Sequence, residues 1–333
     1  MTHDRPLTPA IASVRLAVRR GLEPLSAAGA RVVIALSGGP DSLALAAAAA
    51  FEAPKLGMRP VAVIIDHGLQ AGSADVAARA ARAAEGLGLE ARITTLSIEA
   101  GADGPEAASR DARYAALHAV ADELGAVGIV LGHTLDDQAE SVLLGLARGS
   151  GGTSLQGMAP VGQAEGGSPL IRPLLGVRRA TTHAFCADSG LDPWADPHND
   201  DPRFARVRVR QTVLPMLEAE LGPGVAEALA RTAEQLREDA EAFSDMIDET
   251  IEDIVEHAEA GIQVSVAALV ANPAALRHRI IRHVVASEFG SSLTRLQTLE
   301  VARLVTDWSG QGPIDLPGCH ARREGPRLVF AAR

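Results

Sequence analysis

The chain has 333 residues, enough for two domains. Apolar residues make up 47% and charged residues 22%, which is typical of a globular protein and excludes a disordered chain, a collagen or a small disulfide-stapled domain. The longest strongly apolar run, residues 43–51, is too short to cross a bilayer, and no signal peptide is visible. Cys186 and Cys319 form no CxxC or metal-binding pattern. We therefore expect a cytoplasmic protein with no membrane partner.

The net charge of −11 is unevenly distributed. Residues 239–260 contain nine acids and neither lysine nor arginine, so the rest of the chain carries a net charge of only −2. Residues 261–333 contain nine arginines and five acids, a net +4. The acidic total therefore does not exclude a nucleic-acid partner.

The first half of the chain alternates short apolar runs with helix-favouring segments. Strands that are apolar throughout and alternate with helices predict an α/β fold, a doubly wound and mostly parallel sheet covered on both faces. The predicted strands are residues 31–36, 61–65, 91–96 and 127–131. The predicted helices are residues 43–53, 74–87, 105–124 and 136–148.

The sequence pattern changes after Arg148, where glycine-rich loops precede a mostly helical region. Further helices are predicted at residues 213–221, 225–260, 273–289 and 292–308, and strands at 312–316 and 327–331. We therefore expect three parts: a catalytic domain over residues 1–220, a helical acidic linker over 221–260, and a small α+β domain over 261–333.

Three polar clusters follow predicted strands, at residues 37–42, 66–68 and 133–140. Ligands of parallel sheets bind beyond the carboxyl ends of the strands. The clusters therefore predict a ligand site at that edge of the sheet.

The first cluster reads Ser37-Gly38-Gly39-Pro40-Asp41-Ser42, between a buried strand and a helix. Glycines bring backbone N–H groups close to an anion, and the helix N-terminus adds a positive end. Asp41 would repel a phosphate unless a metal lay between them, so it predicts a nucleotide bound with Mg²⁺. The Walker A pattern is absent. The alternative is a plain strand-to-helix turn with no ligand.

Two arginines lie on the predicted helix 105–124. Arg110 and Arg113 are three residues apart and share a face, and Glu106 lies one turn before Arg110. They could contact a phosphate. The alternative is a solvated face with local ion pairs.

The third cluster contains His133, Asp137 and Glu140, spaced to lie along one helix face at a strand end. Its carboxylates could bind Mg²⁺ or an ammonium group. The alternative is a helix cap, because acids complement the helix dipole. Capping accounts for one of these acids and leaves the rest of the cluster unexplained.

A later segment places four arginines within eight residues, a density that suits phosphate contacts. The alternative is a solvated basic helix start. The four are Arg203, Arg206, Arg208 and Arg210.

Together these segments carry a family resemblance. The 37–42 loop resembles the pyrophosphatase loop (PP-loop) of the N-type ATP pyrophosphatases. The order of the segments is similar to that of the tRNA(Ile)-lysidine synthetase family, over most of residues 30–330. Thr134 and Val207 depart from that family's pattern, which often has histidine and asparagine at these points. The segments are residues 37–42, 66–68, 106–114, 132–141, 148–151, 199–215 and 314–318.

The resemblance implies an enzyme that joins L-lysine to C2 of the wobble cytidine of tRNA(Ile) with a CAU anticodon. ATP first adenylates the cytidine and releases diphosphate; the lysine amine then displaces AMP. Implied cofactors are ATP and Mg²⁺, and implied partners are tRNA(Ile) and L-lysine. The implied catalytic residues are Asp41, Arg113, His133 and Asp137. The implied binding residues are Ser37, Gly38, Gly39, Pro40, Asp41, Ser42, Asp66 and His67 for ATP, Asp41 for Mg²⁺, Asp137 and Glu140 for lysine, and Arg110, Arg206 and Arg210 for tRNA or phosphate.

Two other functions remain open at this point. One is a tRNA thiolase on the same loop, although Cys186 and Cys319 supply no thiolase motif. The other is a non-catalytic nucleotide sensor, which would need neither the acid cluster nor the arginines. The sequence also leaves open whether the protein forms a homodimer.

Overall fold

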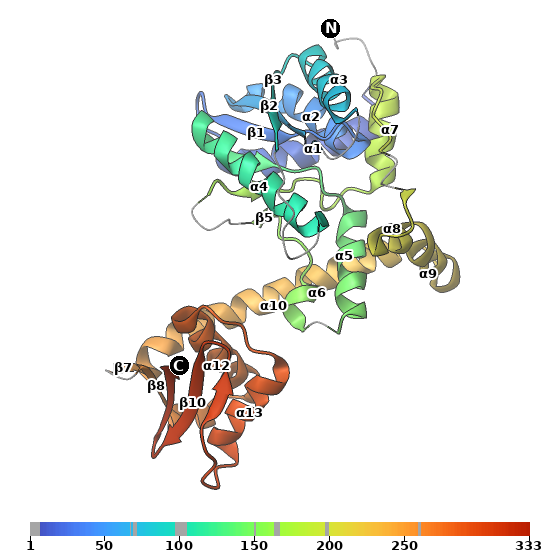
Figure 1. Cartoon of the computed structure of the whole chain (residues 1–333). Coiled ribbons are helices and arrows are strands. Elements are labelled where there is room, and N and C mark those ends of the chain that lie inside the picture. Colours follow the sequence, from blue (N-terminus) through green and yellow to red (C-terminus); the bar gives the residue numbers. More distant parts are fainter. Residues whose placement is uncertain are drawn as a thin grey trace. The chain divides into compact units, whose positions relative to one another are not determined.

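The structure is a computed structural model that describes residues 7–66, 68, 72–96, 105–149, 151–162, 167–196, 200–258 and 261–333. The chain divides into two compact units, Met1–Gln235 and Leu236–Arg333 (Figure 1). Each has its own hydrophobic core. No helix in the described ranges is long and apolar enough to cross a membrane.

Unit 1 is built on a six-stranded sheet in the order β3-β2-β1-β4-β6-β5. All neighbouring strands are parallel except β5 and β6. The doubly wound, mostly parallel α/β fold predicted from the sequence is therefore confirmed. The strands are β1 (Arg31–Ala35), β2 (Arg59–Asp66), β3 (Glu90–Thr95), β4 (Ala126–Val130), β5 (Val161–Gly162) and β6 (Leu170–Ile171).

Helices cover both faces of this sheet because alternate strand residues point to opposite sides. Val32 and Ile34 pack into one core with helices α1, α2, α3 and α7, whereas Val33 packs into a second core with α4 (Figure 1). Helices α1 and α7 were not predicted from the sequence. The bounds are α1 (Pro9–Leu22), α2 (Pro40–Glu52), α3 (Ser73–Gly86), α4 (Pro105–Leu124) and α7 (Arg179–Ser189), with 3₁₀ turns at Glu23–Leu25 and Pro54–Leu56.

Helices α5, α9 and the start of α10 pack around a small apolar cluster that contains Leu135, Val209 and Leu214. A single π-helical turn, Val209–Val213, joins α8 to α9. The helices are α5 (Leu135–Ala147), α6 (Gly152–Leu155), α8 (Ala205–Arg208), α9 (Leu214–Leu221) and α10 (Val225–Ile254), the last continuing into unit 2.

Unit 2 is an antiparallel sheet, in the order β7-β8-β11-β10-β9, packed with helices around its own core. The capping box of Thr294 and Gln297 explains why α13 begins later than predicted. The elements are β7 (Val255–Ala258), β8 (Gly261–Ser265), α11 (Val266–Ala271), α12 (Ala274–Phe289), α13 (Arg295–Thr306), β9 (Ile314–Leu316), β10 (Cys319–Glu324) and β11 (Arg327–Ala332).

The predicted helix over residues 225–260 is wrong at its end. Helix α10 stops at Ile254, and residues 255–258 form β7, which pairs antiparallel with β8. Ile247 and Ile254 are buried in the unit 2 core. Pairing with β8 overrides the local helix preference of the acidic segment, a tertiary effect that helix propensity does not contain.

We expect Ile280→Ala to destabilise unit 2 by about 2–5 kcal/mol, because Ile280 is fully buried in its core and the truncation leaves a cavity. Leu296→Ala is the matched control: this side chain is 69% exposed, so the change should stay within about 0.5 kcal/mol. Urea unfolding followed by fluorescence in a Trp194→Phe background, which leaves Trp308 as the sole tryptophan, reports on unit 2. Equal losses in both variants would contradict this core assignment.

Candidate active site at the carboxyl edge of the parallel sheet

The site lies where the chain reverses its direction across the sheet. Strand β1 pairs with β2 on one side and with β4 on the other, so the segments that follow β1 and β4 diverge beside each other. Such a switch point is the usual ligand crevice of an open α/β sheet. A cavity of about 1090 Å³ opens there. Its lining includes Asp41, Ser42, His133, Asp137, Arg179 and Arg210.

The loop after β1 has the shape of an anion cradle. Gly38 has φ of +86°, a backbone conformation that favours glycine, and Gly39 caps α2. The Ser42 hydroxyl donates to the Gly39 carbonyl at 3.0 Å and accepts from the Ser37 N–H at 3.2 Å. These bonds hold the loop against the N-terminus of α2, where unpaired N–H groups and the helix dipole favour an anion.

The end of β4 lies directly behind this loop. A Cβ at Gly132 would be 3.1 Å from the Ser42 N and Cα atoms. Glycine thus permits a close approach of the two backbones, and the loop that follows β1 is tied in position to the acids that follow β4.

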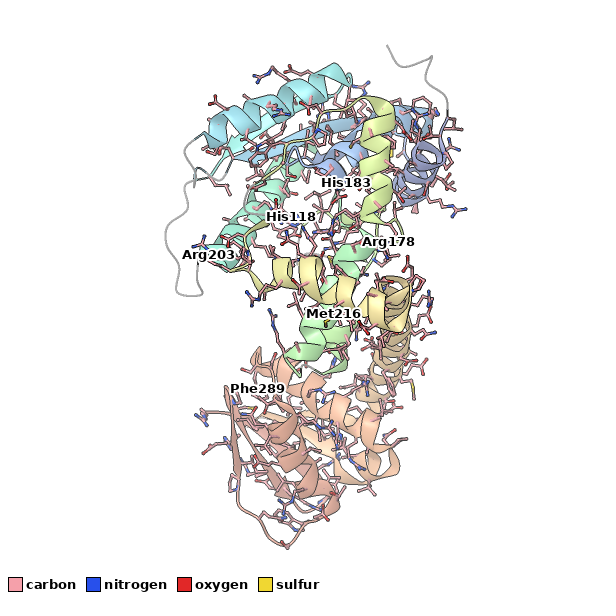
Figure 2. The ribbon with its side chains drawn as sticks, turned by 90° about the vertical axis from the view of Figure 1, so that its right-hand side faces the viewer. His118, Arg178, His183, Arg203, Met216 and Phe289 are labelled. Carbon is pink, nitrogen blue, oxygen red and sulfur yellow. The ribbon has the colours of Figure 1, made fainter. Side chains whose placement is uncertain are left out.

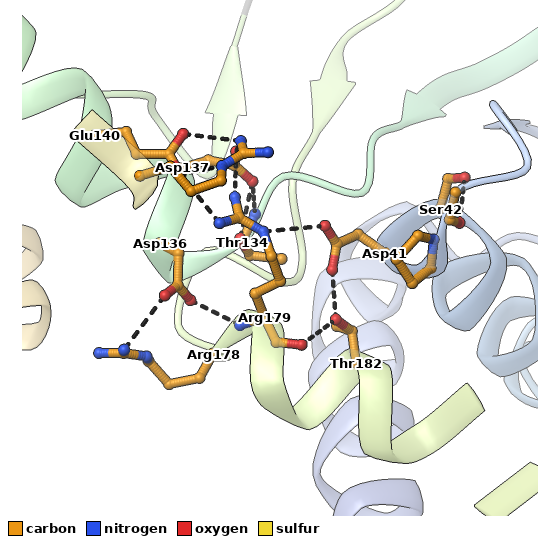
Figure 3. Close-up of polar contacts among 12 residues, drawn as sticks. Asp41, Ser42, Thr134, Asp136, Asp137, Glu140, Arg178, Arg179 and Thr182 are labelled. Carbon is orange, nitrogen blue, oxygen red and sulfur yellow. Dashed lines mark hydrogen bonds and ion pairs between the residues drawn. The ribbon is translucent and has the colours of Figure 1, made fainter. Parts of the chain in front are cut away.

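Asp41 faces the cavity from the first turn of α2. It accepts a short hydrogen bond from the Thr182 hydroxyl and lies 3.5 Å from Arg179 Nε (Figure 3). Burial raises the pKa of this carboxyl above its usual value, although Thr182 and Arg179 oppose the shift. Arg179 and Thr182 both lie on α7, as does His183, and Arg178 directly precedes that helix (Figure 2).

Five side chains form what we call the acid–arginine cluster: Asp137, Glu140, Arg179, Arg206 and Arg210. Glu140 is fully buried, and each of its oxygens accepts two bonds: Oε1 from Arg179 and Arg210 at 3.0 and 2.8 Å, and Oε2 from Arg206 and Arg210 at 2.8 and 3.0 Å. The hydrogen-bonding capacity of Glu140 is therefore filled.

Asp137 is bonded almost as completely. Its Oδ2 accepts from the Thr134 N–H and hydroxyl, both at 2.8 Å, and its Oδ1 accepts from Arg179 at 2.9 Å (Figure 3). The same Oδ1 accepts from Arg206 at 3.3 Å. Asp137 thus caps α5, as the helix-cap interpretation of the sequence predicts, and it also pairs with Arg179 and Arg206 and, at 3.6 Å, with Arg210. Binding of Mg²⁺ or an ammonium group by this carboxylate stays a prediction.

The arginines determine the charge state of both acids. Burial is the largest influence on the pKa of Asp137 and opposes ionisation, but Arg179 and Arg206 outweigh it and the pKa is lowered. In Glu140 burial is again outweighed, here by the Arg210 hydrogen bond and Arg179, so its pKa is also lowered. Both acids are therefore ionised at neutral pH.

His133 lies at the cavity wall, and its Nδ1 is buried with no hydrogen-bond partner among the residues that the structure describes. Burial, with help from Arg172, Arg206 and Arg113, lowers its pKa to about 4, against the attraction of Asp137. The imidazole is therefore neutral at pH 7 and able to accept a proton.

The other residues that the sequence analysis assigned to the site differ in whether they reach the cavity. Arg113 lines the cavity, and Arg110 is exposed beside Tyr114. Asp66 is buried at the end of β2 and accepts from the Gly68 N–H at 3.0 Å. His67 lies outside the described residues.

Cation ligands are sparse at this edge. Within the described part of the chain, no group of three His, Cys, Asp or Glu side chains could hold a metal ion. Asp41 nevertheless presents a carboxylate to the cavity beside the anion cradle. Mg²⁺ commonly binds one or two carboxylates together with substrate phosphates, so this donor set fits a nucleotide-bound Mg²⁺.

Comparison with known proteins identifies the family. The PP-loop domain model matches residues 14–217, and the TilS substrate binding domain model matches residues 265–329. The tRNA(Ile)-lysidine synthase of Leifsonia xyli is 59% identical over 307 residues, covering 91% of this chain and 90% of that protein. The enzyme of the same name from Thermobifida fusca is 46% identical and covers 97% and 98%. The chain belongs to the tRNA(Ile)-lysidine synthase family.

A solved structure shares the fold over about two thirds of the chain. The U34-tRNA thiolase NcsA from Methanococcus maripaludis superposes with a TM-score of 0.59 over 69% of this chain and 80% of that one, at 21% identity. At this identity the likeness concerns the fold alone.

Sequence reasoning missed Arg179, the arginine that contacts Asp41, Asp137 and Glu140 together. Arg179 opens α7, a helix that was not predicted, and no periodic pattern marks it. The role of Arg179 comes from where the fold places it. In this member of the lysidine synthase family, the Arg179 N–H donates to the Asp136 carboxylate at 2.7 Å, and this bond docks the start of α7 against the start of α5.

We expect Arg179→Gln to move acid unfolding to higher pH. The folded-state pKa values of Asp137 and Glu140 lie below those of the unfolded chain, so their stabilisation is complete above about pH 4 and is lost as pH falls further. Without Arg179 the folded-state values rise toward those of the unfolded chain, so the two acids stabilise the fold less at neutral pH and acid unfolding reaches its midpoint at higher pH. At pH 7 the change should cost about 1–3 kcal/mol.

Circular dichroism during acid titration measures the midpoint. Arg92→Gln is the control, because Arg92 pairs only with the exposed acids Glu90 and Glu123 among the described residues. An unchanged midpoint in Arg179→Gln would show that Arg206 and Arg210 alone set the charge of the two acids.

Proposed function

We propose that this protein joins L-lysine to C2 of the wobble cytidine C34 of tRNA(Ile) with a CAU anticodon, using ATP through an adenylated cytidine. One observation carries the proposal: the anion cradle and three members of the acid–arginine cluster, Asp137, Arg179 and Arg210, line a single cavity. The relatives of that name match along nearly the whole length of the chain. We infer a cytoplasmic enzyme, because its substrates are tRNA and ATP.

In the first step, the cytidine O2 attacks the α-phosphate of ATP and diphosphate leaves. The loop of residues 37–42 would hold the leaving diphosphate through backbone N–H groups and the N-terminus of α2. Asp41 would hold Mg²⁺, which neutralises phosphate charge when bound. Thr182 and Arg179 fix the Asp41 carboxylate toward the cavity. Arg113, at the cavity wall, would add positive charge.

In the second step, the lysine amine attacks C2 and AMP leaves. The amine must lose a proton, and His133 is a neutral acceptor at the cavity wall. The cytidine must also be unstacked to enter the cavity, as in other enzymes that act on a base.

Lysine recognition requires the acid–arginine cluster to rearrange. Asp137 and Glu140 suit an ammonium group, but both are filled by arginines. We propose an exchange: phosphates of ATP or tRNA attract Arg206 and Arg210, and the freed carboxylate oxygens accept the lysine ammonium. The Arg206 side chain is the most exposed of the three arginines, at 35%, so it is the first to exchange.

The tRNA is proposed to contact unit 2 through a group of neighbouring arginines. Arg277 donates to the backbone at Leu269 and Asn272 and so has a structural role. Arg282 differs: burial and the nearby Arg279 and Arg295 lower its pKa, as expected in a cluster of like charges. Such a cluster favours phosphate.

The thiolase alternative has little support in this chain. Burial raises the pKa of Cys186 to about 11, its Sγ donates to the Pro40 carbonyl, and it stays a thiol at neutral pH. Cys319 is buried in unit 2.

Mass analysis of the wobble nucleoside, after incubation with ATP, L-lysine and unmodified tRNA(Ile), tests the function. We expect lysidine together with AMP and diphosphate. Asp41→Ala should reduce the rate by about 10²–10³-fold, the loss expected for one contact that stabilises the transition state. Asp122→Ala, an exposed acid on α4, is the control. Incorporated sulfur would indicate a thiolase, and ATP binding without a product would indicate a sensor.

A second experiment addresses the amine site. We expect Asp137→Asn and Glu140→Gln to raise the Michaelis constant for lysine more than the dissociation constant for ATP, because both carboxylates are proposed to receive the ammonium group. Glu227→Gln, which loses a half-exposed acid paired with Arg178, is the control. If only ATP affinity changes, these acids serve the nucleotide.

A further inference from the structure

Three arginines meet around one tyrosine without a carboxylate among the described residues. Arg110 and Arg113, on α4, place their guanidinium carbons 5.6 and 5.4 Å from the centre of the Tyr114 ring. Arg172, directly after β6, lies close enough for Tyr114 and Arg110 to act on its charge. We call Arg110, Arg113, Tyr114 and Arg172 the arginine–tyrosine cluster.

Arg172 is the unusual member because it is partly buried. Its Nη1 donates to the Ala159 carbonyl at 2.9 Å, and the Tyr114 hydroxyl lies close enough to act on the guanidinium, but the buried Nε of Arg172 has no hydrogen-bond partner in the part of the chain that the structure describes. Burial lowers the pKa of the guanidinium; Tyr114 favours its charge and Arg110 opposes it.

The contrast with the neighbouring arginines is clear. Arg178, Arg179, Arg206 and Arg210 each pair with carboxylates. Among the acids whose side chains the structure describes, none pairs with an arginine of the arginine–tyrosine cluster. Buried cations are normally paired, because leaving water without a counter-charge costs free energy. An unpaired, pre-positioned group of this kind fits an anion that arrives from outside.

The position of the cluster indicates which anion. Arg113 lines the large cavity, and the charge of Arg172 acts on His133 at the cavity wall. Arg110 and Arg172 do not line the cavity. The cluster therefore reaches from the cavity wall, at Arg113, to side chains that lie beyond the cavity lining. If one nucleotide of an RNA chain enters the cavity, the backbone phosphates of the adjoining nucleotides lie outside the cavity, close to its wall.

We propose that Arg172, with Arg110 and Arg113, binds a backbone phosphate of the RNA next to the nucleotide that enters the cavity. This inference rests on the proposed function, since it takes RNA as the substrate. Guanidinium groups are suited to it because their N–H donors match phosphate oxygens in pairs. Arg172 is thereby a specific binding residue that fixes the RNA register, and no covalent step is assigned to it.

The test compares Arg172→Gln and Arg110→Gln with a control, Arg92→Gln. Arg92 lies on β3 and pairs with the exposed acids Glu90 and Glu123. Binding of tRNA(Ile) is measured over a series of salt concentrations, and binding of ATP by calorimetry. We expect each cluster variant to bind tRNA several-fold more weakly and to lower the log–log salt slope by about 0.7–0.9, the loss of one phosphate contact. ATP affinity should stay unchanged in all three variants.

Two results would overturn the inference. Weaker ATP binding with unchanged tRNA binding would assign the phosphate to the nucleotide. Unchanged binding of both, in folded variants, would make the cluster structural. If Arg172→Gln fails to fold because the Ala159 contact is lost, Arg110→Gln decides, since Arg110 is exposed. Failure of the proposed function is distinguishable: the wild-type protein would then make no lysidine, whatever the binding data show.

Discussion

The site depends on one guanidinium that is held by three carboxylates. Arg179 contacts Asp41 from the loop after β1, and Asp137 and Glu140 from the helix after β4. The first of these acids belongs to the proposed nucleotide region and the other two to the proposed amine region. Arg179 thus fixes the spacing between the places where the two reacting groups would lie. A small error in such spacing is costly, because catalysis depends on near-contact geometry.

The topology of the sheet makes this contact possible. Strand β4 enters the sheet beside β1, although residues 36–125 separate the two strands along the chain. Gly132 then lets the two backbones approach closely. Helix α7 supplies the guanidinium across the gap, and the Trp194 N–H, just beyond this helix, donates to the Gly38 carbonyl at 2.9 Å. Three segments distant in sequence therefore support one short loop.

The sequence predicted those parts of the molecule that local patterns encode. The parallel strands, the anion loop and the acids after β4 follow from apolar runs and strand-end polar residues. Arg179 could not be predicted in this way, since its role comes from docking between α7 and α5. The end of α10 was wrong for a similar reason: pairing of β7 with β8 decides it, and the acidic composition gives no sign of this. The filled bonding of Glu140 was also invisible, because it depends on arginines that are 39 to 70 residues away.

The pairing of arginines with acids also bears on turnover. A guanidinium that already has a carboxylate partner gains less from a phosphate than a free one, because the new contact replaces an existing one. Arg206 and Arg210 would therefore bind diphosphate less tightly than arginines without a carboxylate partner would. As the product leaves, the two guanidinium groups can pair with Glu140 again. In the proposed reaction the resting ion pairs would thus compete with diphosphate for the same guanidinium groups, which would favour product release and return the site to its starting arrangement.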